Sequence, residues 1–376
     1  MGLFTRRSSR RKSSRSRDKS FSANVPLLRF LGPLFTGTGI IGILFMAITG
    51  RIDLSAVDQW LGSGDVVVAN PSSGSSGDAL AGSAAKPVSI RLGEKPSETM
   101  RIATFNIQFF GPSKVADPNI MQTLAQIVSQ FDVVAIQEVR NSQVQPVRAL
   151  VDLIRASGGD YDFTVSESIG EGTYKEAYAF VFDRSRIALV PGSAYLVQDP
   201  GERMTREPMV ASFQAITKPS DARRPFRFTL INAHTSPSEV AASAIGNEMD
   251  VLDDVFVSVR NYEYDMVGEE DAIMLGDLNV DTRNLRELGQ IPNVVSIAGD
   301  IMTNTRGDKT YDHILIDRTQ TREFTGAYGI LDMKATFGIS EEEAIKISDH
   351  QPLWAEFTMY EFSAQETVAA RPSPLR

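Results

Sequence analysis

The segment "AIMLGDLN", residues 272–279, is an apolar run that stops at Asp277 and Asn279. A short apolar run of this kind predicts a buried β-strand. Residues two apart in an extended chain point to the same side, so Asp277 and Asn279 can face one centre. A single strand end of this type indicates a turn, because Asp and Asn are common turn formers. The other strands decide whether the pair belongs to a larger site.

Seven more segments have the same strand-like character, with helical patterns between them. The strand segments are "RIATFNI" (101–107), "DVVAIQEV" (132–139), "AYAFVFD" (177–183), "MVASFQAI" (209–216), "FRFTLINAH" (226–234), "YDHILID" (311–317) and "PLWAEF" (352–357). Asp117 predicts the N-cap of a helix, and Ser236 with Glu239 forms a capping-box pattern that predicts a helix over 236–260. Six or more strands with mixed connections predict two packed mixed β-sheets flanked by helices.

Polar side chains collect where these strands begin or end. They are Asn106, Gln137, Glu138, Asn232, His234, Asp277, Asn279, Asp312, His313, Asp349 and His350. The chain contains only three histidines, and two of them directly follow an aspartate. Because the same pattern recurs at six strand ends, a shared site is a better explanation than six separate turns.

The residue types at these ends suit one kind of chemistry. Glu138, Asp277 and Asp349 offer hard oxygen ligands of the kind that Mg²⁺ or Mn²⁺ prefers. Two histidines with carboxylate partners can act as base and acid near neutral pH. The sequence has no G-x-S-x-G motif, no phosphate-binding GxxxxGKS and no cysteine, which disfavours acyl transfer, nucleotide motors and thiol chemistry. The pattern fits metal-assisted hydrolysis of a phosphate ester.

The N-terminal region differs from the rest in charge. Residues 1–29 hold nine Lys/Arg and one acid, about +8, whereas the whole chain carries −9, so the remainder carries −9 − 8 = −17. Residues Phe30 to Thr49 contain no charge, and twenty helical residues at ~1.5 Å rise would span ~30 Å, the thickness of a bilayer core. A basic flank before such a run predicts a membrane anchor with the tail in the cytoplasm.

These features divide the chain into five parts. We expect a basic disordered cytoplasmic tail (1–29), a transmembrane signal-anchor helix (30–50), a flexible linker (51–98), a catalytic domain on the outer side (99–362) and a disordered C-terminal tail (363–376). A buried helix of a soluble domain, a cleaved signal peptide and a twin-arginine export signal are alternatives for the apolar segment.

The ordered motifs resemble those of the endonuclease/exonuclease/phosphatase superfamily, and within it the deoxyribonuclease I-like branch. The resemblance covers roughly residues 100–358 and rests on "IATFNIQFFG", "VVAIQEVRNS", "TYKEAYAFVF", "TREPMVASF", "NAHTSP", "MLGDLNVD", "TYDHILID" and "SDHQPLW". It implies a four-layer α/β sandwich. It also implies a monomeric endonuclease that uses Mg²⁺ or Mn²⁺ and has DNA as its partner.

The resemblance also implies a role for each matching residue. The metal ligands are Glu138, Asn106 and Asp349. The catalytic residues are His234 with its carboxylate partner Glu176, His350 with its partner Asp312, and the water-positioning pair Asp277 and Asn279. The residues that contact the substrate are Arg206, Arg140 and Tyr174.

The sequence departs from the family pattern at several places. The loop "IGEGT" (169–173) and Ala177 lack basic residues that are typical at these positions, and the bracing cysteines are absent. His313 stands where an arginine is usual, so we expect it to be structural or to face the substrate. The segment "GDIMTNTRGDKT" (299–310) resembles a structural Ca²⁺ site only in part.

Two other functions are compatible with the sequence. A phospholipid or sphingomyelin phosphodiesterase, or an inositol-phosphate phosphatase, could use the same scaffold beside a membrane. A non-catalytic surface binding domain is the alternative from another class. It predicts the loss of at least one of Glu138, His234, Asp277 and His350, and all four are present.

Overall fold

The computed structural model describes residues 95–140, 144–170, 175–218 and 223–362. The expected tail, anchor and C-terminal tail, and all but the end of the expected linker, lie outside these residues. Within the described part of the chain, no helix combines the length and apolar character needed to cross a membrane.

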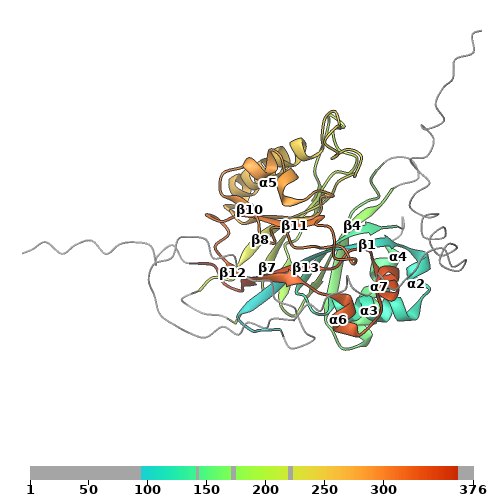
Figure 1. The fold of residues 1–376 in the computed structure, drawn as a ribbon. Coiled ribbons are helices and arrows are strands. Elements are labelled where there is room, and N and C mark those ends of the chain that lie inside the picture. Colours follow the sequence, from blue (N-terminus) through green and yellow to red (C-terminus); the bar gives the residue numbers. More distant parts are fainter. Residues whose placement is uncertain (1–94, 141–143, 171–174, 219–222, 363–376) are drawn as a thin grey trace, which may run out of the picture. The chain divides into compact units, whose positions relative to one another are not determined.

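Two mixed β-sheets form the centre of the domain (Figure 1). In spatial order, the first contains β12 (Phe324–Ile330), β13 (Leu353–Thr358), β1 (Thr99–Phe110), β2 (Val133–Val139), β4 (Ala177–Asp183) and β3 (Tyr161–Val165). The second contains β10 (Val294–Ser296), β11 (Asp312–Asp317), β9 (Ala272–Asp277), β8 (Arg227–His234), β7 (Met209–Ala215) and β5 (Ile187–Leu189), with β6 (Tyr195–Leu196) paired to β7. All eight predicted strand segments are strands in the structure.

Helices cover the outer face of each sheet (Figure 1). The first sheet is covered by α2 (Pro112–Val115), α3 (Pro118–Val128), α4 (Gln145–Ala156), α6 (Met333–Phe337) and α7 (Glu341–Ile347), and the second by α5 (Met249–Val267). Two short 3₁₀ helices, Thr282–Asn284 and Leu288–Gln290, follow β9. Asp117 caps α3 as predicted, because its carboxylate accepts the N–H groups of Asn119 and Ile120.

Alternation along the strands separates three apolar layers. In β4, Tyr178, Phe180 and Phe182 face the second sheet, whereas Ala179 and Val181 face the helices α3 and α4. Because side chains in a strand alternate between faces, each sheet contributes to the central core and to one outer core. The four layers of helix, sheet, sheet and helix therefore confirm the predicted architecture of the domain.

One predicted helix has the wrong bounds. The pattern over 236–260 predicts a helix that starts near Ser236, but α5 begins at Met249. The Ser236 N–H donates to Oε2 of Glu248 at 2.7 Å, and the Glu239 N–H donates to the Ser236 carbonyl within a turn. This contact with Glu248 holds Ser236 in a loop and replaces the expected capping box.

Candidate active site

Strand register places three of the predicted residues side by side. Strands β8 and β9 are parallel with His234 opposite Asp277, and β11 is antiparallel to β9 with Asp312 opposite Asp277. The close approach of β8 to β9 requires glycine at position 276, where φ is 147° and a Cβ would lie 1.8 Å from the Ala233 carbonyl oxygen. His234 and Asp277 line one cleft of about 940 Å³, and Asp312 is buried behind them.

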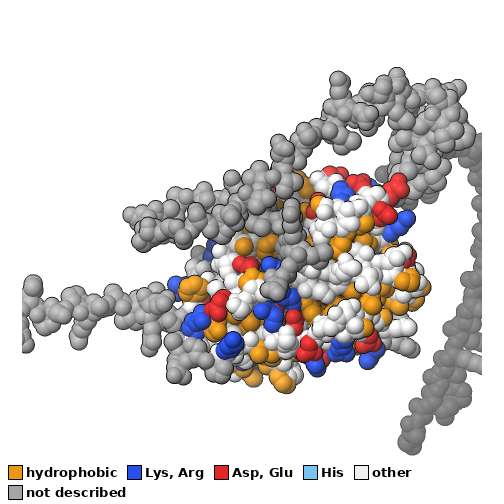
Figure 2. All heavy atoms as spheres, turned by 90° about the horizontal axis from the view of Figure 1, so that it is seen from below, with side chains coloured by type: hydrophobic (Ala, Val, Ile, Leu, Met, Phe, Trp, Pro, Cys, Tyr) orange, Lys and Arg blue, Asp and Glu red, His pale blue; other side chains and the backbone are white. Residues whose placement is uncertain are grey.

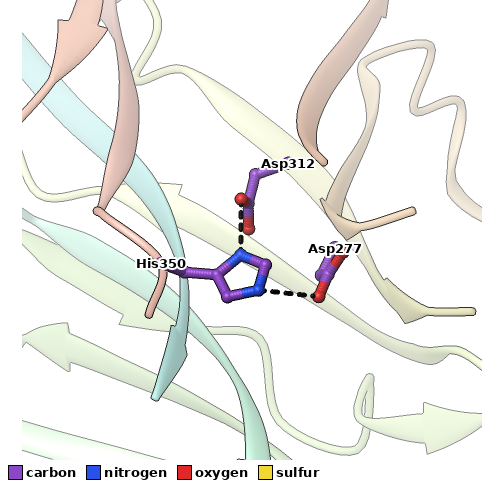
Figure 3. Close-up of side chains that lie close together, drawn as sticks. All are labelled: Asp277, Asp312 and His350. Carbon is purple, nitrogen blue, oxygen red and sulfur yellow. Dashed lines mark hydrogen bonds and ion pairs between the residues drawn. The ribbon is translucent and has the colours of Figure 1, made fainter. Parts of the chain in front are cut away.

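His350 lies between two carboxylates (Figure 3). Its Nδ1 is 2.8 Å from Oδ2 of Asp312, and its Nε2 is 3.4 Å from Oδ2 of Asp277. Burial by itself lowers the pKa of His350, but Asp312 and Asp277 outweigh it and raise that pKa to about 10. These three residues are close enough to hold a metal ion. Because each ring nitrogen faces a different carboxylate, the arrangement also suits proton transfer, with Asp312 orienting the ring.

His234 forms a second pair of the same kind. Its Nδ1 is 2.6 Å from Oε1 of the buried Glu176, and its Nε2 is 3.6 Å from Oδ2 of Asp277. Burial opposes a charged imidazole, yet Glu176 more than compensates, so the pKa of His234 is raised. Burial would also raise the pKa of Glu176, but His234 and Arg206 hold it below its usual value. Both histidines thus direct Nε2 at the same carboxylate oxygen.

The predicted metal ligands lie beside this pair of histidines. Asn106 Nδ2 donates to Oδ2 of Asp277 at 2.9 Å and to Oε1 of Glu138 at 3.3 Å. Its Oδ1 is buried and has no hydrogen-bond partner among the described residues. Burial, and then the charges of Glu138 and Asp277, raise the pKa of Asp349. Glu138, Asp349 and the unpartnered amide oxygen of Asn106 offer only oxygen ligands, and the two carboxylates repel each other. Such a set fits a hard divalent cation.

The two described arginines of the predicted substrate side line the cleft. Arg206 is buried, donates from Nε to the His234 carbonyl and from Nη2 to the Thr235 carbonyl, and lies 3.4 Å from Glu176. Arg140 lies 3.5 Å from Oε2 of Glu138 and 3.6 Å from Oε2 of Glu176. Both therefore place positive charge beside the histidines. Tyr174 lies outside the described residues.

Backbone strain concentrates at this cleft. Four of the seven described non-glycine residues with positive φ line it, namely Phe109, Glu138, Glu202 and Asn279. Asn279, with φ of 53°, donates from Nδ2 to the Thr235 carbonyl, and its N–H donates to Oδ1 of Asp277. Such conformations each cost on the order of 1 kcal/mol or more and are typical of functional sites.

His313 does not line the cleft and is structural. It is fully buried, and its Nε2 and Nδ1 lie 2.9 Å and 3.0 Å from the Val280 carbonyl and the Ser296 hydroxyl. Burial lowers the pKa of His313, so the ring is neutral. In the segment 299–310, Asn304 Nδ2 donates to Oδ1 of Asp308 at 2.6 Å, and the binding of Ca²⁺ there stays a prediction.

Three further residues hold parts of the site in place, and the sequence did not predict these roles. Gln108 Nε2 donates to Asp349 at 2.8 Å, and the Ser348 hydroxyl donates to the Asn106 carbonyl at 2.6 Å. Lys114 donates to the Lys346 and Ile347 carbonyls at the end of α7, and burial lowers its pKa to about 8. Only the adjacency of Gln108 and Ser348 to motif residues could have signalled these roles.

Charge is mixed on the face of the domain shown in Figure 2. Lys/Arg and Asp/Glu side chains both lie mainly towards the edge of its visible part, and hydrophobic and uncharged groups cover much of the rest. The cleft itself is lined by Glu138, Glu176, Glu202, Glu239, Asp277 and Asp349 and by three arginines. With six acids and three arginines, the lining of the cleft is net acidic, so charge attraction by the lining alone does not favour a polyanion.

Sequence comparisons agree with this geometry. The model of the Endonuclease/Exonuclease/phosphatase family matches residues 103–350. Deoxyribonuclease-1-like 2 of Homo sapiens is 31% identical over 281 residues, which covers 68% of this chain and 90% of that protein. Deoxyribonuclease-1-like 2 of Mus musculus is 30% identical over 279 residues, with 71% and 94% covered. Deoxyribonuclease-1 of Sus scrofa is 30% identical over 273 residues, with 68% and 90% covered.

Proposed function

Because the chain belongs to the endonuclease/exonuclease/phosphatase family and is therefore a phosphoric ester hydrolase, we propose that it is a metal-dependent endonuclease that cleaves DNA. The observation that carries this proposal is the convergence of the Nε2 atoms of His234 and His350 on Asp277 Oδ2, at 3.6 and 3.4 Å. Two separately oriented histidines provide the two proton transfers that phosphodiester hydrolysis needs. The names of the deoxyribonuclease relatives support DNA as the substrate.

Each residue of the cleft then has a defined task. Asp277, with Asn279 beside it, positions the water that attacks phosphorus, and one histidine accepts the proton of this water. The bond from phosphorus to the 3′ oxygen breaks on the opposite side, and the other histidine protonates that oxygen. Because Asp312 and Glu176 bind the Nδ1 atoms, each ring keeps Nε2 available for these transfers.

Charge on the phosphate is balanced from two sides. A divalent cation held by Glu138, Asn106 and Asp349 would stabilise the charge that develops on the nonbridging oxygens. Arg206, fixed by two backbone carbonyls, contributes positive charge from the chain itself and contacts the same phosphate. Arg140 contacts the adjoining backbone of the DNA.

A plasmid assay tests the proposal. Full-length protein in nonionic detergent is incubated with supercoiled plasmid and Mg²⁺ or Mn²⁺, with a chelator and the His350→Ala variant as controls. We expect metal-dependent nicking that the variant loses. Intact plasmid together with hydrolysis of sphingomyelin would overturn the DNA assignment and keep the hydrolase. Nicking that His350→Ala retains would overturn the assigned site.

We also propose that residues 30–50 anchor the enzyme as a single-pass protein with its catalytic domain outside the cytoplasm. The uncharged segment and the preceding tail of about +8 support this orientation. Membrane fractionation and protease treatment of intact cells test it. Digestion of the domain by external protease, with the tail protected, is the expected result, and recovery of the full chain in the soluble fraction would refute the anchor.

A further inference from the structure

A second group of carboxylates lies at the opposite end of β9 from the active site. Asp271 directly precedes β9, Glu323 directly precedes β12, and Glu361 follows β13. One carboxylate oxygen from each lies within 4.8 Å of the others. Since β9 belongs to the second sheet and β12 and β13 to the first, this group, the far-end cluster, joins the two sheets.

The cluster is buried and under-partnered. Asp271 is 7% exposed and Glu323 is 2% exposed. Asp271 Oδ1 and Glu323 Oε2 are both buried without a hydrogen-bond partner among the described residues. Buried carboxylate oxygens normally accept hydrogen bonds or bind cations, because an unpartnered one loses its hydration without compensation. Two such oxygens in one group are available as ligand atoms for a cation.

Hydrogen bonds from the backbone fix the orientation of the carboxylates. The N–H of Phe362 donates to Oε1 of Glu323 at 2.8 Å, and the N–H of Arg227 donates to Oε1 of Glu361 at 2.9 Å. Each bond holds one oxygen of its carboxylate, and for Glu323 the unpartnered oxygen is Oε2. The cluster is thus held in place by main-chain groups of neighbouring segments.

The nearest positive charges are not paired with the cluster. Among the described residues, no lysine or arginine forms an ion pair with Asp271, Glu323 or Glu361. Burial raises the pKa values of Glu323 and Glu361, and Arg322 and Arg224 lower them only from a longer range. A fourth acid, Glu269, is 8% exposed and has Arg227 at 3.5 Å. Burial raises the pKa of Asp271 to about 9, and the charges of Glu323 and Glu269 add to this rise. Without a ligand, the cluster would have to bind protons in order to lower its repulsion.

We propose that the far-end cluster is a structural binding site for a divalent cation of the Ca²⁺ type. Asp271, Glu323 and Glu361 supply the ligand oxygens, and Glu269 adds charge beside them. The set contains only carboxylates, which suits Ca²⁺ and not Zn²⁺, and Ca²⁺ accepts the irregular geometry of ligands from three segments. Glu361 is partly exposed and provides the route of entry. The ion would link the two sheets at the end opposite the catalytic histidines.

Thermal unfolding of full-length protein tests the site independently of the proposed activity. Circular dichroism is recorded in chelator, in Ca²⁺ and in Mg²⁺ for the wild type, for Glu323→Gln and for Glu138→Gln. Glu323→Gln alters the far-end cluster, and Glu138→Gln is the matched change at the active site. For the wild type we expect Ca²⁺ at a hundred times its dissociation constant to raise Tm by about 5 °C.

The variants separate the two sites. Glu138→Gln should keep the Ca²⁺-dependent rise, whereas Glu323→Gln should lose it and have a higher Tm than the wild type in chelator, because repulsion is reduced. Asp271→Asn is the second variant and should behave like Glu323→Gln. A Ca²⁺ response that persists in both cluster variants, or that Glu138→Gln abolishes, would overturn the proposal. If Ca²⁺ does not raise the Tm of the wild type, the cluster binds only protons, and the proposal is overturned as well.

Discussion

Strand β9 begins at one group of buried carboxylates and ends at another, and the two groups have different neighbours. At its end, Asp277 faces His234, His350 and the amide of Asn106. At its start, Asp271 faces other carboxylates and has an oxygen without a partner. Histidines beside a carboxylate can exchange protons near neutral pH, whereas carboxylates beside carboxylates can only share a cation or bind protons. The neighbours of a buried acid therefore decide whether it performs chemistry or supports the fold.

Removal of His350 should have the largest effect, and it should be confined to the catalytic end. We expect His350→Ala to lower kcat by about 10³-fold, because the loss of a positioned acid or base costs 10²–10⁴-fold. The Ca²⁺-dependent rise in Tm should be unchanged. Plasmid nicking rates and thermal unfolding provide the two measurements.

His313→Gln is the matched control for this change. The third histidine is buried away from the cleft, so its loss should lower stability by about 1–3 kcal/mol and leave kcat within a few-fold of the wild type. A variant at position 350 that kept a tenth of the wild-type rate would contradict the assignment of the active site.

Gly276→Ala should disturb the strand that joins the two ends. A Cβ at this position would meet the Ala233 carbonyl at 1.8 Å, so β8 and β9 would have to separate. We expect a loss of about 3 kcal/mol or more in the free energy of unfolding, together with loss of nicking. Denaturant titration of the purified variant provides the measurement.

Gly268→Ala is the control that separates the steric clash at position 276 from the cost of a positive φ in a non-glycine residue. Gly268 also has positive φ, 72°, but a Cβ there would meet no atom within 4 Å. Its substitution should cost only about 1 kcal/mol. Equal losses in the two variants would mean that the contact with Ala233 does not determine the spacing of the strands.

The residues of the active site could be predicted from the sequence because they directly follow apolar runs that predict buried strands. The motif around Asp277 ends a strand whose burial is visible as "AIML", and the histidines are rare enough to stand out. The pairing of each histidine with its carboxylate could not be predicted from sequence spacing. His234 and Glu176, for example, are far apart in the chain and meet only because the two sheets pack together. Sequence gives no direct measure of that packing.

The far end was not predicted, for a physical reason. Glu323 and Glu361 lie in ordinary polar connections, where acids are common on exposed surfaces. Their burial follows from the pairing of β12 with β13, and β12 was not singled out in the sequence. The helix expected over 236–260 failed similarly, because the contact between Ser236 and Glu248 overrides a favourable local pattern.

The far-end cluster should make the stability of the protein depend on pH. In chelator, the pKa of Asp271 is raised to about 9 and those of Glu269 and Glu361 to about 7, chiefly by burial. Acids with raised pKa bind more protons in the folded state, so their contribution is complete below about pH 4 and is lost as pH rises towards 9. We expect the wild type to lose on the order of 2 kcal/mol between pH 5 and pH 9.

The same measurement on Glu323→Gln sharpens the comparison of the two ends. Neutralising one acid should flatten the decline, because the remaining carboxylates repel each other less. His350, whose pKa is raised from 6.5 to about 10, also loses its contribution as pH rises from about 6.5 towards 10. That loss is common to the wild type and Glu323→Gln, so the difference between the two profiles reports the far-end cluster. A decline of equal slope in Glu323→Gln would assign the pH dependence to another part of the protein.

Phe109→Gly should have the smallest effect on stability and a selective effect on binding. Phe109 is 57% exposed in the cleft, has φ of 49°, and has the Arg140 guanidinium 5.4 Å from its ring centroid. Glycine relieves the left-handed strain while its greater freedom in the unfolded chain offsets part of the gain, so stability should change by at most about 1 kcal/mol. The effect of this variant on catalysis should be confined to substrate binding. The backbone N–H of residue 109 that donates to Glu138 at 2.9 Å is kept, so kcat should stay unchanged. We expect the ring to stack against a base or sugar of the substrate, so KM for DNA should rise about fivefold or more in Phe109→Gly, whereas Phe109→Tyr should keep the wild-type KM. An unchanged KM in Phe109→Gly would mean that the strained, exposed ring does not contact DNA.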